Sequence, residues 1–227
     1  MARQSKRRRR LDCPTVTAPP PARGTRSVLV LAGPSGAGKS RLAQRLAQRH
    51  GWPVLELDDF YLEAGDPRLP GPSGEPTDWD DVRTWDQAAA RQALHTLCSD
   101  GAVQVPVYDI PTSTTSGSRV VQAGEASVIV AEGIFAAHLI EDLRRCGLLA
   151  AAWCIRGRPW VTFARRLVRD VREHRKGLGT LWRRGHRLRR TQAGIVQAQQ
   201  ALGAVPMTAS LAEERARSLD RTSAGRG

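Results

Sequence analysis

The hydrophobic positions of the chain form short, mostly apolar runs that alternate with longer segments of helical spacing. Runs of about four to eight apolar residues are typical of strands buried on both faces of a parallel sheet. The four runs are Val28–Ala32, Val54–Leu57, Val128–Ala131 and Leu148–Ile155. Helical spacing covers residues 39–50, 85–100, 136–146, 191–202 and 208–219, and a further helix is expected from Pro159. This alternation predicts an α/β fold, in which a parallel sheet carries helices on both faces.

Two stretches do not fit the alternation. Residues 62–78 are rich in proline and glycine, so we expect a long surface loop, and loops of this length in compact domains usually have a function. Val103–Tyr108 has strand character, but Pro106 within it predicts an edge strand or a bulge. The polar residues 111–119 are expected to form a loop.

The first apolar run leads directly into a glycine-rich segment. Its residues are Gly33, Pro34, Ser35, Gly36, Ala37, Gly38, Lys39 and Ser40. Glycines let successive backbone N–H groups turn towards phosphate oxygens, and the following helix adds its positive N-terminal end. Lys39 can reach the β- and γ-phosphates, and the Ser40 hydroxyl can ligate Mg²⁺. The alternative is a chance glycine turn. A strand before the segment and a helix after it favour a phosphate-binding loop and a nucleotide ligand.

Carboxylates follow two other predicted strands. Asp58 and Asp59 end the second run, and Glu132 ends the third. In a parallel α/β sheet the carboxyl ends of the strands meet at one edge, where ligands bind. Glu132 is placed to hold Mg²⁺ directly or through water, and Asp58 to take a proton from an attacking hydroxyl. Each acid alone is also compatible with a helix cap or a solvated loop; together with the glycine-rich segment they favour a phosphoryl-transfer site.

Charge changes the picture at two places. The net charge of +13 is concentrated in the first ten residues, with six Arg or Lys, and in residues 156–190, with thirteen Arg or Lys against two acids. The remaining chain is slightly acidic, which argues against a uniform nucleic-acid-binding surface. We expect residues 1–26 to be a disordered basic, proline-rich leader, more often simply solvated than bound to nucleic acid or anionic lipid. Residues 27–220 are expected to form one domain.

The four cysteines show no metal-binding or redox spacing, so reduced thiols are expected. They are Cys13, Cys98, Cys146 and Cys154. No apolar run reaches the length of a transmembrane helix, and no apolar stretch follows the charged N-terminus as in a secretory signal. The expected compartment is therefore the cytoplasm, with no membrane partner.

Several motifs in order resemble the uridine kinase/phosphoribulokinase group of P-loop kinases, and uridine kinases most of all. Beside the phosphate loop, they are DDFY at 58–61, DWDDVRTWD at 78–86, PVYD at 106–109, AEGIF at 131–135 and ARRLVRDVREHRKG at 164–177. The resemblance covers residues 28–180. It implies a P-loop kinase fold with an arginine-rich helical lid at about 156–190, and Mg²⁺-dependent transfer of the γ-phosphoryl group of ATP or GTP to a small substrate with a primary hydroxyl. Related kinases often assemble, so a homo-oligomer is compatible with the resemblance.

The resemblance also implies roles for single residues. Asp58 would be the catalytic base near the metal, and Glu132 would support the metal. Asp80 would hold the sugar hydroxyls of the substrate, and Tyr108 would contact the nucleobase. The basic residues Arg166, Arg169 and Lys176 would lie on the lid, where positive charge compensates the transferring phosphoryl group. A solvated basic helix is the alternative for this segment.

The chain departs from the family pattern on the acceptor side. Ile110 replaces a phenylalanine, and Ser113 and Thr115 stand where uridine kinases have a histidine and an arginine. The motif at 78–86 continues with Asp81-Val82 in place of His-Pro. The phosphoryl-transfer machinery is therefore better supported than uridine as acceptor. Another nucleoside, pantothenate or a sugar remain alternatives, as does a non-catalytic protein that binds nucleotides or associates with nucleic acid.

Overall fold

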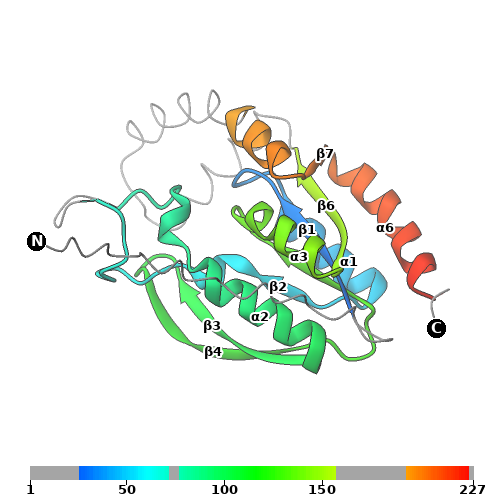
Figure 1. Ribbon diagram of the computed structural model, residues 1–227, viewed down its shortest axis with the longest axis horizontal. Coiled ribbons are helices and arrows are strands. Elements are labelled where there is room, and N and C mark those ends of the chain that lie inside the picture. Colours follow the sequence, from blue (N-terminus) through cyan, green and yellow to red (C-terminus); the bar gives the residue numbers. More distant parts are fainter. Residues whose placement is uncertain (1–25, 72–76, 157–192, 225–227) are drawn as a thin grey trace, which may run out of the picture.

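The fold is built on a five-stranded parallel sheet. The computed structural model describes residues 26–71, 77–156 and 193–224 (Figure 1). In this part of the chain the strand order is β2-β5-β1-β6-β7, and every neighbouring pair is parallel. The strands are β1 Ser27–Ala32, β2 Val54–Glu56, β5 Val128–Glu132, β6 Leu149–Ile155 and β7 Val205–Met207. The predicted α/β class and the four apolar runs are thus confirmed.

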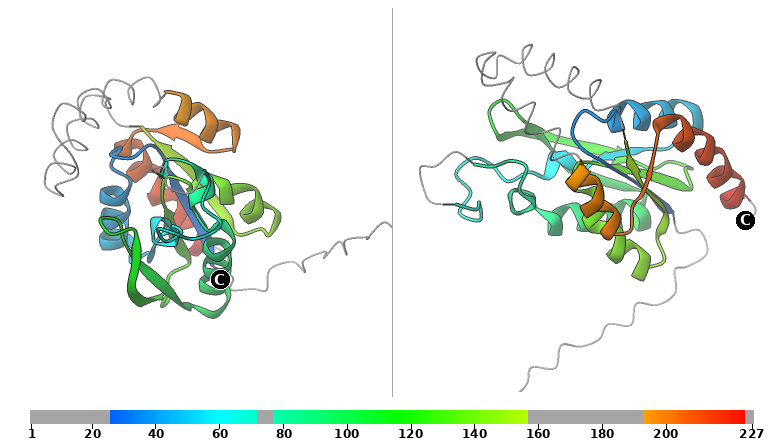
Figure 2. Two further views of the ribbon diagram at one scale, coloured as in Figure 1. Left: turned by 90° about the vertical axis from the view of Figure 1, so that its left-hand side faces the viewer. Right: turned by 90° about the horizontal axis from the view of Figure 1, so that it is seen from above.

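Helices cover both faces of this sheet, as predicted (Figure 2). They are α1 Lys39–His50, α2 Gln87–Asp100, α3 Ile140–Arg145, a helix over residues 193–201, and α6 Ala209–Ala224. The expected helix at 136–146 is divided, because a 3-10 turn over Ala136–Leu139 precedes α3. No helix in the described part of the chain is both long and apolar enough to span a membrane.

Strand β1 lies at the centre and divides the core in two. Successive side chains of a strand point to opposite faces. Val28 and Val30 accordingly pack in one cluster, with leucines of α2 and α3. Leu29 and Leu31 pack in the other, with leucines of α1 and alanines of α6. Strand β1 is hydrogen-bonded to a strand on each side, and helices cover both of its faces. Residues 28–32 are therefore fully buried. This explains why the strand is a continuous apolar run.

An antiparallel hairpin stands apart from the sheet, next to α2 (Figure 1). It consists of β3 Ala102–Asp109 and β4 Thr114–Gln122. The expected loop at 111–119 is wrong, because most of it belongs to β4. That strand is exposed along most of its length, so it carries no apolar alternation that would identify it. Pro106 lies within this two-stranded hairpin, next to a register shift between Val107 and Tyr108, in agreement with the expected edge or bulge.

The glycine-rich segment packs tightly against β6 where it leaves β1. Gly33 has φ of 139°, and a Cβ at this residue would lie 2.6 Å from the carbonyl oxygen of Ile155. Both features require glycine, since L-residues rarely adopt this φ and a backbone oxygen cannot move aside easily. Helix α1 then begins at Lys39. The close contact with β6 fixes the position of the loop at the carboxyl edge of the sheet.

We predict that Gly33→Ala lowers the free energy of unfolding by about 1–3 kcal/mol from backbone strain alone, and further through the clash with Ile155. Urea unfolding measures the change. Gly117→Ala is the matched control: no atom lies within 4 Å of the added Cβ, and the exposed strand position should change stability by less than about 0.5 kcal/mol. Equal effects of the two substitutions would contradict this packing.

Candidate functional site

The register of the sheet brings three strand ends together. Leu31 of β1 pairs with Glu132 of β5, and Glu132 pairs in turn with Glu56 of β2. The glycine-rich segment follows β1, and Asp58 follows β2 in a short 3-10 helix, Leu57–Phe60. Residues from three separate parts of the sequence therefore meet at one edge of the sheet, as the sequence predicted.

Glu132 is the most unusual group at this edge. Only 6% of its surface is exposed. Burial raises the pKa of its carboxyl, and the nearby carboxylates of Asp58 and Glu56 raise it further, whereas the Lys39 ammonium and a hydrogen bond with Ser40 act in the opposite direction. Its Oε2 atom has no hydrogen-bond partner among the described residues. A buried, unpaired carboxylate oxygen is costly and requires an explanation.

A hard divalent cation would satisfy this oxygen. Mg²⁺ prefers oxygen ligands, usually one or two carboxylates together with phosphate oxygens and water. The Glu132 carboxylate is hydrogen-bonded to Ser40 and interacts electrostatically with Asp58, so three oxygen-bearing side chains are close together. Lys39 is itself buried and donates a hydrogen bond to the carbonyl of Pro34, at 3.5 Å. These residues fit a magnesium ion at the phosphate loop.

Asp58 is held by the turn that follows β5. The N–H of Ile134 donates to Asp58 Oδ1 at 3.2 Å. The approach is close because residue 133 is glycine: a Cβ there would lie 2.9 Å from Asp58 Oδ1 and 3.0 Å from the Cβ of Leu57. The glycine in the motif at 131–135 therefore lets the backbone reach the carboxylate of Asp58.

The adjacent acid, Asp59, has different partners. Its carboxylate accepts hydrogen bonds from Arg119 of β4, at 3.0 Å, and from the backbone N–H of Tyr108, at 3.2 Å. Arg119 also lies 3.5 Å from Glu56. Asp59 thus anchors the hairpin, whereas Asp58 lies at the phosphate loop. The role of Arg119 was missed, because its segment was expected to be a loop.

Tyr108, whose backbone N–H is bonded to Asp59, belongs to a cluster of aromatic rings. The ring centroid of Tyr61 lies 5.7 Å from that of Tyr108 and 5.8 Å from that of Trp79, and Phe135 also contacts Tyr61. The Tyr108 hydroxyl donates to the carbonyl of Leu62, and burial raises its pKa. Asp80 is exposed next to Trp79. Each ring comes from one of the sequence motifs, yet only Tyr108 was predicted as a site residue.

The tip of the hairpin is joined to the segment after Tyr61. The N–H of Ala64 donates to the carbonyl of Ser113 at 2.8 Å, and the N–H of Thr115 donates to Glu63 at 3.2 Å. Ser113 and Thr115 are the two positions where uridine kinases have a histidine and an arginine. Here their backbone groups hold the hairpin against residues 62–64.

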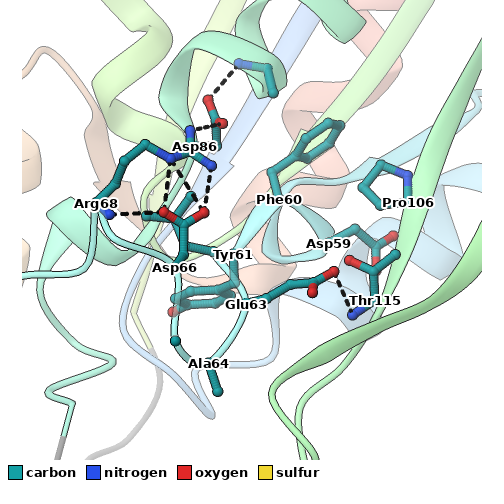
Figure 3. A pocket seen from close by; sticks show the side chains of 13 residues that line it. Asp59, Phe60, Tyr61, Glu63, Ala64, Asp66, Arg68, Asp86, Pro106 and Thr115 are labelled. Atoms are coloured by element: carbon teal, nitrogen blue, oxygen red, sulfur yellow. Dashed lines mark hydrogen bonds and ion pairs between the residues drawn. The ribbon is translucent and has the colours of Figure 1, made fainter.

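A cavity of about 470 Å³ lies beside this junction (Figure 3). Its wall includes residues 59–66, the start of α2, and the hairpin residues Pro106 and Thr115. Arg68 closes one side with ion pairs to Asp66 at 2.8 Å and to Asp86 at 2.6 Å. Residues 33–40 do not line it, so this cavity is separate from the phosphate loop.

Comparisons with known proteins agree with this geometry. A family model described as an AAA domain matches residues 28–104. Uridine-cytidine kinase C of Dictyostelium discoideum is 31% identical over 156 residues, 69% of this chain and 32% of the relative. Inorganic pyrophosphatase TTM1 of Arabidopsis thaliana is 29% identical over 142 residues, 62% of this chain and 20% of the relative. The chain therefore spans about a third of the length of the first of these curated relatives and a fifth of the length of the second.

A solved structure extends the likeness to most of the chain. The crystal structure of a proposed fructose transport system kinase from Silicibacter sp. TM1040 superposes with a TM-score of 0.55 at 21% identity, covering 81% of this chain and 88% of that one. The chain has an α/β P-loop kinase fold. At this identity the superposition establishes the fold, and the activity is taken up below.

In this P-loop kinase fold, the phosphate loop over residues 33–40 and two predicted carboxylates meet at one edge of the sheet, and Asp80, away from them in sequence, is exposed next to Trp79. Lys39, Ser40, Asp58 and Glu132 come together. Tyr108 lies in the aromatic cluster, and its backbone N–H is bonded to Asp59. The basic residues Arg166, Arg169 and Lys176 of the expected lid lie outside the described residues, as does the leader up to residue 25. Their roles remain predictions.

The raised pKa of Glu132 predicts a pH-dependent cost to the nucleotide-free protein. The folded state binds the Glu132 proton more tightly than the unfolded chain, whose reference pKa is 4.5. Above that pH the folded state therefore loses stability as the carboxyl ionises. Glu132→Gln cannot ionise, so its free energy of unfolding should rise relative to that of the wild type as the pH increases above 4.5.

Urea unfolding at several pH values measures this difference. Glu125→Gln, at an exposed glutamate, is the matched control and should show no such trend. A Glu132→Gln protein that loses stability relative to the wild type as the pH rises would contradict the assignment.

Proposed function

We propose that the chain is a nucleoside-triphosphate-dependent small-molecule kinase, which transfers a γ-phosphoryl group to the primary hydroxyl of a nucleoside such as uridine. The observation that carries the proposal is the unpaired, buried Glu132 oxygen next to Lys39, Ser40 and Asp58. A buried carboxylate opposite a phosphate-loop lysine suits a site that binds a metal and a polyphosphate together.

On the donor side, backbone N–H groups of residues 33–40 and the N-terminus of α1 would bind the phosphates of ATP or GTP. The Lys39 ammonium would contact the β- and γ-phosphates. Mg²⁺, held by Ser40, Asp58 and Glu132, would neutralise charge on the phosphate oxygens. We assign Arg166 and Arg169 the same electrostatic task on the transferring group, on the basis of their motif.

In the transfer step, the oxygen of the acceptor hydroxyl forms a bond to the γ-phosphorus. The bond from this phosphorus to the oxygen bridging the β- and γ-phosphates breaks, and the nucleoside diphosphate leaves. Asp58 takes the hydroxyl proton, and the hydrogen bond from Ile134 orients its carboxylate. Positioning of the two substrates contributes most of the acceleration, because phosphoryl transfer needs little covalent assistance.

On the acceptor side, two features support a neutral, aromatic substrate. The rings of Tyr61, Trp79 and Tyr108 offer faces on which a nucleobase can stack, with Asp80 nearby for sugar hydroxyls. The charged groups along residues 58–68 are mostly acids, and Arg68 is already paired with Asp66 and Asp86. This balance disfavours an anionic acceptor such as pantothenate.

Hydrolysis is the second candidate, because a pyrophosphatase is among the relatives. The same site would act as a hydrolase if water replaced the acceptor hydroxyl. The two functions differ in one measurable respect: a kinase consumes the triphosphate in proportion to the phosphorylated acceptor, whereas a hydrolase releases phosphate without one.

The test is a screen of nucleosides, sugars and pantothenate with ATP or GTP and Mg²⁺, following both phosphorylated product and free phosphate. We expect a nucleoside to be phosphorylated best. Asp58→Asn should lower kcat about 10²–10⁴-fold, the usual contribution of a general base, and leave nucleotide binding largely intact. Asp59→Asn is the matched control, since that acid contacts the hairpin; it should alter the acceptor KM more than kcat.

Three results would contradict the proposal. Phosphate release that no acceptor affects would assign a hydrolase. Nucleotide binding without turnover on any acceptor would assign a non-catalytic protein. Near-normal kcat in Asp58→Asn would remove Asp58 as the base.

A further inference from the structure

A buried glutamine joins the C-terminal part of the chain to the turn that holds Asp58. Gln199 lies on the helix over residues 193–201, next to β7 in Figure 1, and only 5% of its surface is exposed. Its Nε2 donates to the carbonyl of Ile134 at 2.9 Å, and its Oε1 accepts from Cys154 Sγ of β6 at 3.1 Å. Both ends of the amide are therefore paired.

Ile134 connects this amide directly to Asp58. Its carbonyl accepts from Gln199, and its N–H donates to Asp58 Oδ1. The backbone hydrogen bonds of the preceding residue are long: Gly133 donates to Leu31 at 3.3 Å and accepts from Ala136 at 3.4 Å. The shorter bond from Gln199 is thus a main constraint on the orientation of this turn.

Packing alone does not explain a glutamine at position 199. A buried amide loses its hydration and stabilises the fold only if both of its polar ends are paired, so leucine or methionine would fill the same space at lower cost. The Cys154 thiol is a weak hydrogen-bond donor, and its bond adds little. The strong partner of the amide is the carbonyl of Ile134.

We propose that Gln199 is a positioning residue for Asp58: it fixes the Ile134 backbone and thereby the direction of the Asp58 carboxylate. The inference rests on the proposed function in so far as Asp58 takes the acceptor proton. The contact from Gln199 to Ile134 is separate from that activity. Small displacements of a reacting group lower the rate of transfer, while donor binding at residues 33–40 is untouched.

The experiment compares Gln199→Leu with Gln200→Leu, a matched control at the exposed next position of the same helix. With the acceptor found in the screen, Gln199→Leu should lower kcat about tenfold and leave the KM for the nucleotide within about twofold. Gln200→Leu should change neither constant. Cys154→Ala removes only the weaker bond of the amide and should keep kcat close to the wild-type value.

Amide hydrogen exchange provides a readout that does not require activity. Gln199→Leu should speed exchange at Ile134, whose N–H is bonded to Asp58, and leave exchange in β1 and the rest of β5 unchanged. Gln199→Met, which keeps an unbranched side chain of similar length, replaces Gln199→Leu if the latter does not fold.

Specific outcomes overturn the proposal. An unchanged kcat in Gln199→Met, together with unchanged exchange at Ile134, would show that the Gln199 amide does not orient the Ile134 backbone or Asp58. A loss of kcat together with an equal rise in both KM values and faster exchange throughout the sheet would indicate a general structural role. If the wild type phosphorylates no acceptor, the proposed function fails. Faster exchange confined to residues 133–135 in the Gln199 variant would then still support the constraint that Gln199 places on this turn.

Discussion

A buried carboxylate at the carboxyl edge of the sheet is the constraint on which the rest of the site depends. Parallel pairing of β2, β5 and β1 forces Glu132 next to Glu56 and directly behind the phosphate loop. Isolated from water, this charge is unfavourable unless a cation compensates it. The Lys39 ammonium compensates part of this charge, and the unpaired Oε2 is available to bind a further cation.

The two consecutive acids that follow β2, Asp58 and Asp59, have different partners. Asp58 lies against the Gly133–Ile134 backbone, and Asp59 anchors Arg119 of the hairpin. A single short 3-10 helix, Leu57–Phe60, thereby links the carboxyl edge of the sheet to the hairpin. The tip of the hairpin is joined to residues 62–64 through the backbone groups of Ser113 and Thr115, so the side chains at these two positions can vary without disturbing the phosphate loop. The family pattern weakens in this region.

The sequence was informative where local pattern and burial coincide. Val28–Ala32 is apolar throughout because β1 is covered on both faces, and the glycine-rich segment has a spacing that phosphate binding requires. Strand β4 was missed because an exposed, polar strand lacks apolar alternation, and β7 because it has three residues including Pro206. The parts played by Arg119 and Gln199 depend on contacts across 60 and 65 residues of sequence, to Asp59 and Ile134, which no local pattern encodes.

The most direct test of the account is the effect of Mg²⁺ on nucleotide affinity in wild type and Glu132→Gln, measured by calorimetry with ATP and GTP. If the unpaired carboxylate oxygen serves a metal at the phosphate loop, Mg²⁺ should strengthen binding to the wild type, and Glu132→Gln should lose most of this gain while it still binds the nucleotide. Glu125→Gln should behave as the wild type. An equal gain from Mg²⁺ in wild type and Glu132→Gln would contradict the central claim.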